Sequence, residues 1–512
     1  MKKKFRKALL ALLTCGVVGL TSCQFGSPVD VDRELPTDDP TSATEIVFWH
    51  CLGHDKTSVL QNIVDKFNAE YAGKYQVRLQ KVAGDYDSLH ENIKTRLAAN
   101  EVPALAMGYP DSFSEYISSD MNYSSILRLD SYIDDPNYGY TDEELDDFVS
   151  EYIEEGRNYQ FEGTWSMPMY KSTEIMYYDV FYFAGDNQQT QKKFESIGGT
   201  VYSDYNNLLA PLTGPKASDK DVEALRKFVS ENDGYTYDLP ATWDEMITVA
   251  RAMNKDRQTE GVNDEFYPVG YDSDSNLFIS QFAQRGISYT VNDEASQATP
   301  SAHYQFNNND AKEFATEIYN LIQEKVLITK GSLGGDTYTN EYFNNRKCVM
   351  SIGSTGGSTY QWSDNFKVGL APVPYSGDTP KYIMQGPSIC FFNNENDYIH
   401  KGAWLFYKMM ADPVNNAQLA LQNSYDPIRN SSYETTDYLS YIGNANKGLG
   451  LNYDIPNATK ELKEYYMTTP VFIGSSTARD QIGMIIQYMV GQKMSVEQAF
   501  ETAYNTCVRG GN

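Results

Sequence analysis

In the N-terminal part of the folded chain, segments with the apolar pattern of a strand alternate with segments that have the apolar spacing of a helix. Apolar residues fill Glu45–Trp49 and 103–109, which predicts two buried strands, and 76–82 alternates like a half-buried strand. Apolar positions from 59 to 67 recur at spacings of three and four, which predicts an amphipathic helix. A capping box at Ser88–Glu91 predicts the start of a second helix. This β-α-β-α-β order predicts a parallel sheet with helices on both faces.

The carboxyl ends of these strands predict where a ligand would bind. In open sheets of this kind, ligands bind in the crevice beyond the carboxyl ends of the strands. Trp49 and His50 end the first strand, and Tyr109 and Asp111 follow the third. We therefore expect these four residues at an edge of the sheet that faces a crevice.

The stretch 165–179 is an extended, aromatic-rich run far from either end of the chain. Pro168 disfavours a helical conformation at the preceding residue, and most of the later positions are strand formers. We interpret the stretch as a crossing from one lobe to another with a cleft beside it; an ordinary buried strand is the alternative. Residues 384–388 and 425–429 are interpreted as a second and a third crossing.

The second half of the chain continues with helix and strand signals. Thr242 and Glu245 form a capping box at a helix start, and Gly353–Ser358 is a glycine-rich turn after a strand. Such a turn can offer backbone N–H groups to an anionic or hydroxylated ligand, although a plain loop is an equal alternative. Residues 185–235 are polar and contain glycine, which favours an insertion. Further strands are predicted in 267–271, 343–352 and 368–373, and helices at 314–326, around 403–410 and in most of the tail from 460.

The N-terminus has the pattern of an export signal. Residues 1–7 are basic and 8–20 form an apolar run that is too short to span a bilayer comfortably. The run ends in Leu20-Thr21-Ser22-Cys23, which resembles a bacterial lipobox, so we expect a signal peptide at 1–22 and lipidation of Cys23. A plain signal peptide with a chance cysteine is the alternative. Residues 24–44 are rich in Asp, Pro, Ser and Thr and predict a flexible tether.

Composition narrows the class of protein. A chain of 512 residues is too long for one core, so two or more domains are expected. The formal charge of -27 falls to about -32 without the basic leader, which disfavours nucleic acid as a partner. The 40 tyrosines offer flat faces with polar tips, which suits sugar binding as well as ordinary packing.

Neither disulfides nor metals are indicated. The remaining cysteines of the exported chain are widely spaced, so no disulfide framework is expected. His50–His54 has two histidines around a cysteine but no second ligand cluster, so we expect no metal site. The acidic run 134–155 lacks the spacing of a calcium loop and is interpreted as a solvated helix face.

Several motifs occur in an order and spacing found in a known family. Residues 165–179 correspond to the first hinge strand of that family, and Pro240–Glu245 resembles its Pro-x-Thr-Trp-Asp-Glu helix start. Phe343–Gly353 resembles its Phe-x-x-Gly-Lys-x-Ala-Met-x-Ile-Gly run, with Arg346 where glycine is usual. The other motifs are Phe48-Trp49-His50, Leu97–Ala104 and Pro427-Ile428-Arg429. With these motifs, the chain from about residue 45 to its end resembles the family 1 extracellular solute-binding proteins of ABC transporters, the maltose-binding-protein-like group.

The resemblance implies an α/β fold with two lobes, each a sheet flanked by helices, joined by hinge strands. It places 45–167 and 387–426 in the N-terminal lobe and 168–386 and 427–512 in the C-terminal lobe. It also implies that the lobes close around a small solute, most often a mono- or oligosaccharide, and deliver it to a membrane permease.

The same resemblance implies a set of cleft residues. Trp49 and Tyr170 would stack on a sugar, and Asp111, Gln385 and Arg429 would hydrogen-bond to it. His50, Ser354 and Gly356 would complete the lining. Many sugar-binding members have an aromatic residue just after the Gly-Ser turn, whereas this chain has Thr355 and Gly356, and Tyr360 or Trp362 would have to take its place.

The expected function is therefore that of a monomeric, lipid-anchored receptor on the outer face of a cell membrane or in a periplasm, without a cofactor or catalytic activity. A surface adhesin that holds glycans without closing, and a secreted glycoside hydrolase, are the alternatives. No Gly-x-Ser-x-Gly elbow is present, and no carboxylate pair stands out at a strand end.

Overall fold

The computed structural model describes residues 33–99, 101–117, 124–179, 182–183, 237–259, 261, 264–363, 366, 368–445 and 450–510. The predicted signal peptide, the lipidation site Cys23 and the predicted insertion at 185–235 lie outside the described residues.

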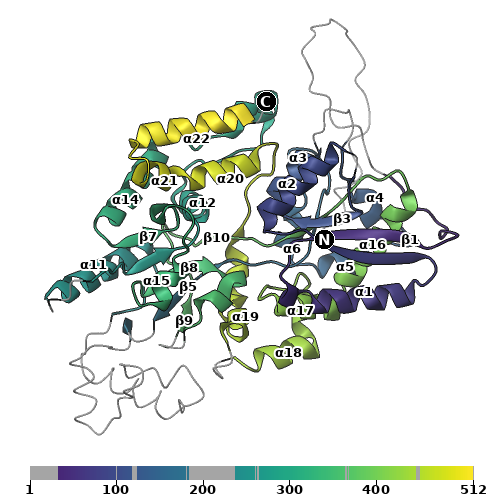
Figure 1. Ribbon diagram of the computed structural model, residues 1–512, viewed down its shortest axis with the longest axis horizontal. Helices are drawn as coiled ribbons and strands as arrows, with labels where there is room; N and C mark the ends of the chain where they lie inside the picture. The colour runs from purple at the N-terminus through teal and green to yellow at the C-terminus, as the bar shows by residue number, and fades with distance from the viewer. Residues whose placement is uncertain are drawn as a thin grey trace, which may run out of the picture.

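Two lobes are each built around a five-stranded mixed sheet (Figure 1). In the first sheet β1 pairs in parallel with β2 and β3, which confirms the predicted β-α-β-α-β unit, and β11 runs antiparallel to β3 and β4. In spatial order its strands are β2 (Tyr75–Lys81), β1 (Thr44–His50), β3 (Leu105–Gly108), β11 (Ser388–Phe391) and β4 (Met167–Pro168).

Helices cover both faces of the first sheet. Because β2 and β3 lie on opposite sides of β1, right-handed crossovers place α1 and α2 on opposite faces. Helix α1 buries Leu60, Ile63, Val64 and Phe67, and each such side chain stabilises the fold by about 1.5–3 kcal/mol. The elements of this lobe are η1 (His54–Lys56), α1 (Ser58–Glu70), α2 (Tyr86–Leu97), α3 (Pro110–Ile117), α4 (Asp130–Ile133), α5 (Asp142–Asp146), α6 (Ser150–Glu155), α16 (Asp397–Met410) and α17 (Pro413–Gln422). Two further helices, η6 (Asn430–Glu434) and α18 (Thr436–Ile442), pack on α17.

The second sheet repeats the pattern. Strand β6 pairs in parallel with β7 and β8, and β5 runs antiparallel to β8 and β9. In spatial order its strands are β7 (Leu327–Thr329), β6 (Val269–Tyr271), β8 (Met350–Ser354), β5 (Glu174–Asp179) and β9 (Val368–Ala371).

The helices of the second lobe include the C-terminal α20 and α22, which pack on each other beside α12 (Figure 1). The capping box predicted at the start of α11 is confirmed, because Glu245 accepts from the Thr242 amide at 3.1 Å and the Glu245 amide donates to Thr242 Oγ1 at 3.3 Å. The elements are α11 (Trp243–Thr259), α12 (Asp274–Arg285), α13 (Glu294–Ala298), η3 (Pro300–His303), α14 (Asn309–Gln323), η4 (Gly331–Leu333), α15 (Asn340–Asn344), η5 (Thr355–Gln361), η7 (Leu451–Tyr453), α19 (Ile455–Thr459), η8 (Lys460–Tyr465), α20 (Ser475–Gly483), α21 (Ile485–Val490) and α22 (Val496–Gly510).

The lobes are joined by extended segments that pair with one another. The first crossing runs from β4 to β5, and its Ser172 exchanges backbone hydrogen bonds of 2.8 Å with Gln385 of the second crossing. Lys171 pairs in the same way with Asp426. A short parallel pair, β10 (Tyr382–Ile383) and β12 (Tyr466–Met467), lies beside them. The crossing predicted at 165–179 is thus the segment that links the two sheets.

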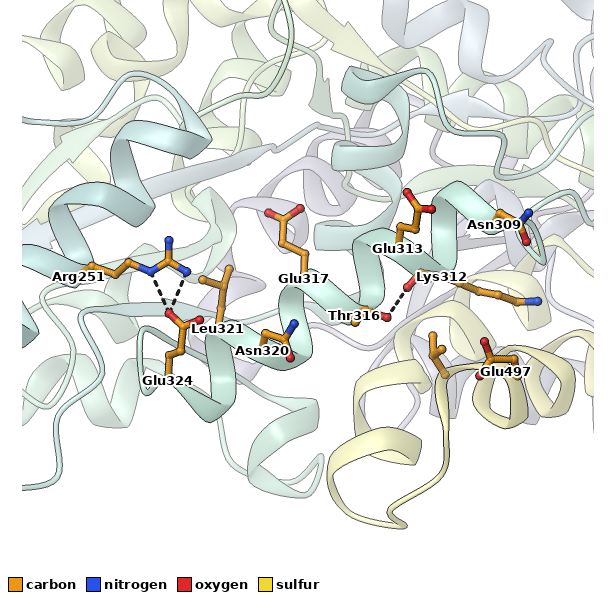
Figure 2. Close-up of a pocket in the computed structure, with 11 residues that line it drawn as sticks. Arg251, Asn309, Lys312, Glu313, Thr316, Glu317, Asn320, Leu321, Glu324 and Glu497 are labelled. Atoms are coloured by element: carbon orange, nitrogen blue, oxygen red, sulfur yellow. Dashed lines mark hydrogen bonds and ion pairs between the residues drawn. The ribbon is translucent and has the colours of Figure 1, made fainter.

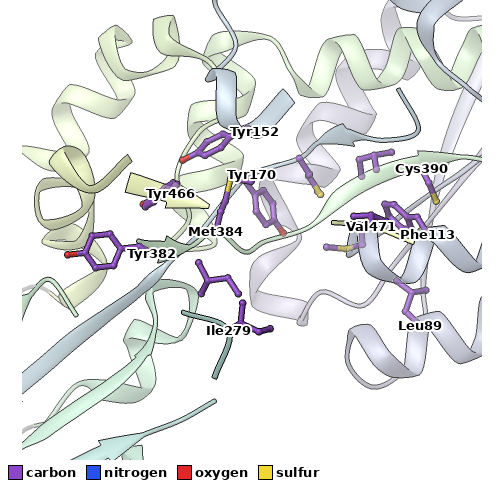
Figure 3. Close-up of a cluster of buried hydrophobic side chains, with 14 of the residues drawn as sticks. Leu89, Phe113, Tyr152, Tyr170, Ile279, Tyr382, Met384, Cys390, Tyr466 and Val471 are labelled. Carbon is purple, nitrogen blue, oxygen red and sulfur yellow. The ribbon is translucent and has the colours of Figure 1, made fainter. Parts of the chain in front are cut away.

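One apolar core continues from lobe to lobe through these crossings. Figure 3 shows Leu89 and Phe113 of the first lobe in the same buried cluster as Ile279 and Tyr382 of the second, with Tyr170 between them. The lobes therefore share packing at the crossings as well as backbone hydrogen bonds.

Two local expectations differ from the structure. The N-cap of α2 is Asp85, not Ser88, because the Asp85 carboxylate accepts from the Ser88 amide at 3.0 Å and from its hydroxyl at 2.8 Å. Arg346 adopts a φ of 56°, in the left-handed region that favours glycine, which explains why glycine is usual at this position in the family it resembles.

The predicted division of the chain between the lobes stays a prediction. The third crossing touches the first lobe, because the Val149 amide donates to the Ile428 carbonyl at 3.0 Å and the Asn430 amide donates to the Asp147 carbonyl at 2.7 Å. These contacts favour counting the chain just after 427 with the first sheet.

Candidate functional site

A pocket lies between the lobes, at the carboxyl ends of strands from the first sheet. Its accessible space is about 40 Å³ and is partly open to solvent, so the two lobes lie close together here. Residues just after β3 form one wall, the second crossing and the chain after β12 form the floor, and α20 supplies the opposite wall. Its lining residues are Tyr109, Pro110, Asp111, Glu155, Ile383, Met384, Gln385, Thr468, Thr469, Val471 and Arg479.

Asp111 and Arg479 face each other across this pocket. Asp111 is in the first turn of α3, and Arg479 is in α20, which packs against α3 from the other lobe. Burial raises the pKa of Asp111, while the Arg479 charge and a hydrogen bond with Ser475 act in the opposite direction. The pair therefore offers a ligand one strong acceptor and one strong donor from different lobes.

Polar side chains continue inward from Arg479. Its guanidinium donates to the side-chain oxygen of Asn276, and the Asn276 amide donates to Glu174 at 2.8 Å and to Gln385 at 2.9 Å. The hydroxyl of Tyr271 donates to the other Glu174 oxygen at 2.6 Å. This network joins α20, α12, β5 and the second crossing, so it couples the floor of the pocket to the first and second crossings.

Glu174 is the carboxyl group most altered by this setting. Burial raises its pKa to about 7, even though the hydrogen bonds from Tyr271 and Asn276 favour the charged form. The group holds its proton in the folded chain over a pH range where the unfolded chain has lost it.

Stability should therefore depend on pH through Glu174. At pH values below the ordinary carboxyl pKa of 4.5 the group is protonated in both states and has no effect. As pH rises towards 7, the unfolded chain loses this proton first, so the free energy of unfolding falls. The free energy of unfolding of Glu174→Gln, measured in urea, should therefore rise relative to that of the wild type by up to about 3 kcal/mol between acidic and neutral pH. The exposed Glu313→Gln on α14 serves as the control. A pH-independent difference for Glu174→Gln would contradict the assignment.

Tyrosine rings lie near the pocket, and Tyr109 is the one that lines it, whereas Tyr170 is fully buried. Tyr86 and Tyr109 of the first lobe have ring centroids 4.6 Å apart, and Tyr170 and Tyr425 from the first and third crossings are 4.5 Å apart. Gly356, just after β8 in the second lobe, lies so near Tyr425 that a Cβ there would be 2.7 Å from the ring. The two lobes thus meet at Gly356 and Tyr425. The space between the Gly356 backbone and the Tyr425 ring leaves no room for a Cβ atom.

Gly356→Ala should therefore hinder the approach of the lobes. The added methyl group would have to displace the Tyr425 ring, at an overpacking cost of about 1–3 kcal/mol. We expect ligand affinity to fall by about 5- to 150-fold, measured by calorimetry. Gly357→Ala is the matched control, because a Cβ there meets no atom within 4 Å. Equal affinities for the two variants would show that the contact has no part in binding.

Some predicted site residues meet at this pocket. Asp111 and Gln385 line it, whereas Tyr170 and Gly356 lie against Tyr425, which is not a lining residue. Ser354 caps the following turn, since its Oγ accepts from the Gly356 amide at 3.2 Å. Their roles in binding stay predictions.

Three predicted residues lie elsewhere. Trp49 and His50 are buried in the first lobe, with 5% and 3% exposure, and His50 Nδ1 accepts from the Leu52 amide at 3.2 Å. Burial lowers the pKa of His50 to about 4. Arg429 is held by Asp147 at 2.8 Å, with its guanidinium 4.4 Å from the Phe148 ring. Each of these side chains makes its contacts within the first lobe, and none of them lines the pocket.

The prediction placed Tyr109 at the edge facing the crevice, where it lines the pocket, but missed Arg479, Asn276 and Tyr86. A weak signal for α20 was present, since Gly474-Ser475-Ser476 is typical of a helix start near a turn. Nothing in the local sequence distinguishes Arg479 from a surface arginine, because its role depends on the meeting of α20 with α3.

A second hollow lies on the outer surface of the second lobe and is less suited to a ligand. Figure 2 shows its exposed, charged side chains along α14, with Arg251 paired to Glu324 at 2.8 Å. Exposed ion pairs of this kind contribute little to the stability of the fold, and salt screens them. It shares no lining residue with the pocket between the lobes.

The described chain offers few other sites. Within the described ranges, no helix is long and apolar enough to cross a membrane. The same residues hold no group of three or more His, Cys, Asp or Glu side chains placed to bind a metal ion, and the four described cysteines are unpaired.

Comparisons with known proteins agree with this architecture. A family model described as bacterial extracellular solute-binding protein matches residues 62–446. The sn-glycerol-3-phosphate-binding periplasmic protein UgpB of Pectobacterium atrosepticum is 22% identical over 411 residues, covering 77% of this chain and 76% of that protein.

Solved structures show the same fold. UgpB from Mycobacterium tuberculosis, in complex with glycerophosphocholine, superposes with a TM-score of 0.63 at 15% identity, covering 91% of this chain and 97% of that one. The cyclic alpha-maltosyl-1,6-maltose binding protein of Arthrobacter globiformis gives 0.59 at 15% identity, covering 92% and 99%. The sugar-binding MalE of Xanthomonas citri gives 0.61 at 14% identity, covering 91% and 97%.

The family model spans most of the chain, and the two-lobed fold agrees with it. The chain belongs to the bacterial extracellular solute-binding protein family and is a solute-binding protein of an ABC importer.

Proposed function

We propose that this protein captures a mono- or oligosaccharide in the pocket between its lobes and delivers it to a membrane permease. The observation that carries the proposal is the combination of paired tyrosine rings with a network of guanidinium, amide and carboxylate groups at one crevice. Tyr109, beside Tyr86, supplies the ring that lines the pocket, and Asp111, Gln385 and Arg479 supply the polar groups.

The chemistry of a sugar matches both halves of this site. Each hydroxyl donates one hydrogen bond and accepts others, so carboxylate, amide and guanidinium groups can all be satisfied by it. The C–H face of a sugar ring is apolar and packs against an aromatic face. Closure of the lobes would bury both kinds of contact and give the permease a distinct liganded shape.

A phosphorylated solute is the second candidate, because UgpB relatives bind glycerol phosphate or glycerophosphocholine. The charge of the crevice disfavours it. Arg479 is the single basic residue among those that line the pocket, and Asp111 and Glu155 line it as well. Asp480 lies next to Arg479, and burial together with the nearby Asp87 raises its pKa to about 6. Since Glu155 is paired with Lys171, a phosphate would meet the Asp111 carboxylate beside the Arg479 guanidinium.

The wider setting follows from the N-terminal pattern. We propose export, cleavage before Cys23 and lipidation of that residue, which would hold a monomeric receptor on the outer face of the membrane or in a periplasm. Catalysis, a cofactor, a metal and a nucleic-acid partner are not part of the proposal. Hydrolysis of any glycan would instead favour the glycoside hydrolase.

Thermal unfolding against a panel of sugars, oligosaccharides and phosphorylated polyols tests the proposal. A ligand at 100 times its dissociation constant should raise the free energy of unfolding by about 2.7 kcal/mol. A saturable shift with one sugar supports the proposal. A shift with glycerol phosphate alone, or with no carbohydrate, would overturn the choice of ligand.

A further inference from the structure

The segment that precedes β1 is bound to the first lobe. Composition predicts a flexible tether up to residue 44, whereas the structure ties its last part, 33–43, to three separate stretches of that lobe. We call residues 33–43 the strap. At its start, Arg33 pairs with Asp397 of α16 at 3.1 Å, and the Arg33 carbonyl accepts from the Ser131 hydroxyl of α4 at 3.0 Å. The chain thus reaches the lobe beside α4 and the start of α16.

The middle of the strap contributes to the interior of the lobe. Leu35 is 5% exposed and belongs to the main buried apolar cluster. The Tyr138 hydroxyl donates to the Thr37 carbonyl at 3.3 Å, and the Tyr398 hydroxyl of α16 donates to the Asp38 carboxylate at 3.0 Å. Apolar burial and hydrogen bonds therefore both hold the strap in one position on the lobe.

Lys401 of α16 depends on the strap for its hydrogen bonds. Its side chain has no exposed surface, and its ammonium donates to three acceptors. Two of them belong to the strap, the Asp38 carbonyl at 2.8 Å and the Asp39 carboxylate at 3.1 Å, and the third is the Tyr138 hydroxyl at 2.9 Å. Lys74 pairs with the same Asp39 carboxylate at 2.7 Å. Because a buried ammonium without partners is costly, Lys401 favours the bound strap over a free one.

A bound strap shortens the free connection between the lobe and the proposed lipid anchor. From Cys23 to Arg33 the chain has about 10 residues, which span at most about 36 Å when fully extended. A connection that was free up to Thr44 would have about 21 residues and could span about 75 Å. Binding of the strap therefore roughly halves the greatest distance between the anchor and the lobe, and it fixes the point at which the lobe is held.

We propose that the strap holds the first lobe close to the membrane, with the side that carries Ser131 and the start of α16 facing the lipid surface. The inference rests on the proposed lipidation of Cys23 and does not depend on the identity of the solute. All the strap contacts described above lie in the first lobe. The second lobe is therefore the one that moves relative to the membrane when the cleft closes.

Neutron reflectometry of the lipidated full chain on a supported phosphatidylcholine bilayer tests the inference. The release variant combines Arg33→Ala, Leu35→Ser and Asp39→Ala, which remove strap side chains and leave the rest of the lobe unchanged. We expect the wild-type protein layer to lie against the bilayer. The layer of the release variant should extend outward by up to about 40 Å more, because the free connection becomes longer.

Two further variants separate the position of the strap from the folding of the lobe. The matched control changes three exposed strap residues and should give the wild-type layer; it combines Thr37→Ala, Thr41→Ala and Ser42→Ala. Insertion of about ten Gly and Ser residues just before Arg33 keeps every strap contact, and it should also move the layer outward, by up to about 36 Å.

Cleavage by a glutamate-specific protease tests the bound strap without a membrane. The peptide bond after Glu34 adjoins the buried Leu35, so the strap has to leave the lobe before the protease can cut there. Mass spectrometry of the lipidated chain in detergent follows this cleavage. The release variant should be cut after Glu34 at least about 10-fold faster than the wild type and the matched control.

The possible failures differ from one another. Equal layers for the wild type and the release variant would overturn the inference, and so would equal cleavage rates after Glu34 or an unchanged layer for the insertion variant. Each of these results would leave the lipid anchor standing. A Cys23→Ser variant that binds the bilayer as the wild type does would overturn the anchor together with the inference, and the proposed sugar binding would remain.

Discussion

Replacing Lys171 with methionine should lower the free energy of unfolding by about 3–5 kcal/mol. Lys171 has no exposed surface, and its ammonium donates to Glu155 of α6, to the Ser388 hydroxyl at 3.0 Å and to the Gly386 carbonyl at 3.2 Å. Methionine would leave Glu155 buried without its cation. Urea unfolding followed by circular dichroism measures the change.

The reason for so large an effect is the position of Lys171. It lies in the first crossing, and its ammonium holds the second crossing against the first lobe. Double replacement, Lys171→Met with Glu155→Gln, removes both charges and should recover part of the loss. Lys347→Met is the matched control, because its ion pair with Glu265, at 2.6 Å, is 43% and 46% exposed and should be worth no more than about 1 kcal/mol. A Lys171→Met variant as stable as Lys347→Met would contradict this account.

Replacing Arg479 with glutamine should weaken binding of the carbohydrate found in the panel by about 10- to 150-fold. Arg479 is the cation of the pocket lining, and it donates to Asn276 within the second lobe. Its loss would remove a charged hydrogen bond to the ligand and leave Asp111 without the facing charge. The dissociation constant from calorimetry is the measurement.

An arginine on the outer face provides the control for this variant. Arg251 pairs with Glu324 on α14, at the hollow of Figure 2, and Arg251→Gln should leave affinity unchanged. Affinity is compared where both variants are folded, because Arg479→Gln also leaves Asp111 without its facing charge. An Arg479→Gln protein that binds as tightly as Arg251→Gln does would remove Arg479 from the site.

Sequence patterns predicted the parts of the fold that depend on neighbours along the chain. The helix at 58–70, the capping box of Thr242 and Glu245, and the crossing at 165–179 all have local physical causes, which are periodicity, capping and strand propensity. The start of α2 was wrong by three residues because Asp85 and Ser88 are both good caps, and only the folded backbone chooses between them.

The site was harder to predict because it depends on contacts between distant segments. Strand position put Trp49 and His50 near the correct edge, yet both side chains pack into the first lobe. Arg429 was assigned to a ligand, whereas Asp147, far away in the sequence, holds it. Asp111 and Gln385 line the pocket because their backbone positions already decide where they lie, and their roles in binding stay predictions.

Small-angle X-ray scattering with and without the sugar found in the panel tests most directly whether the lobes close around a solute. The extended crossings and the close approach at Gly356 predict that the radius of gyration falls when the ligand saturates the protein, and that Gly356→Ala reduces this change. A radius that stays constant under saturating ligand would contradict closure and favour an adhesin that binds glycans on an open surface.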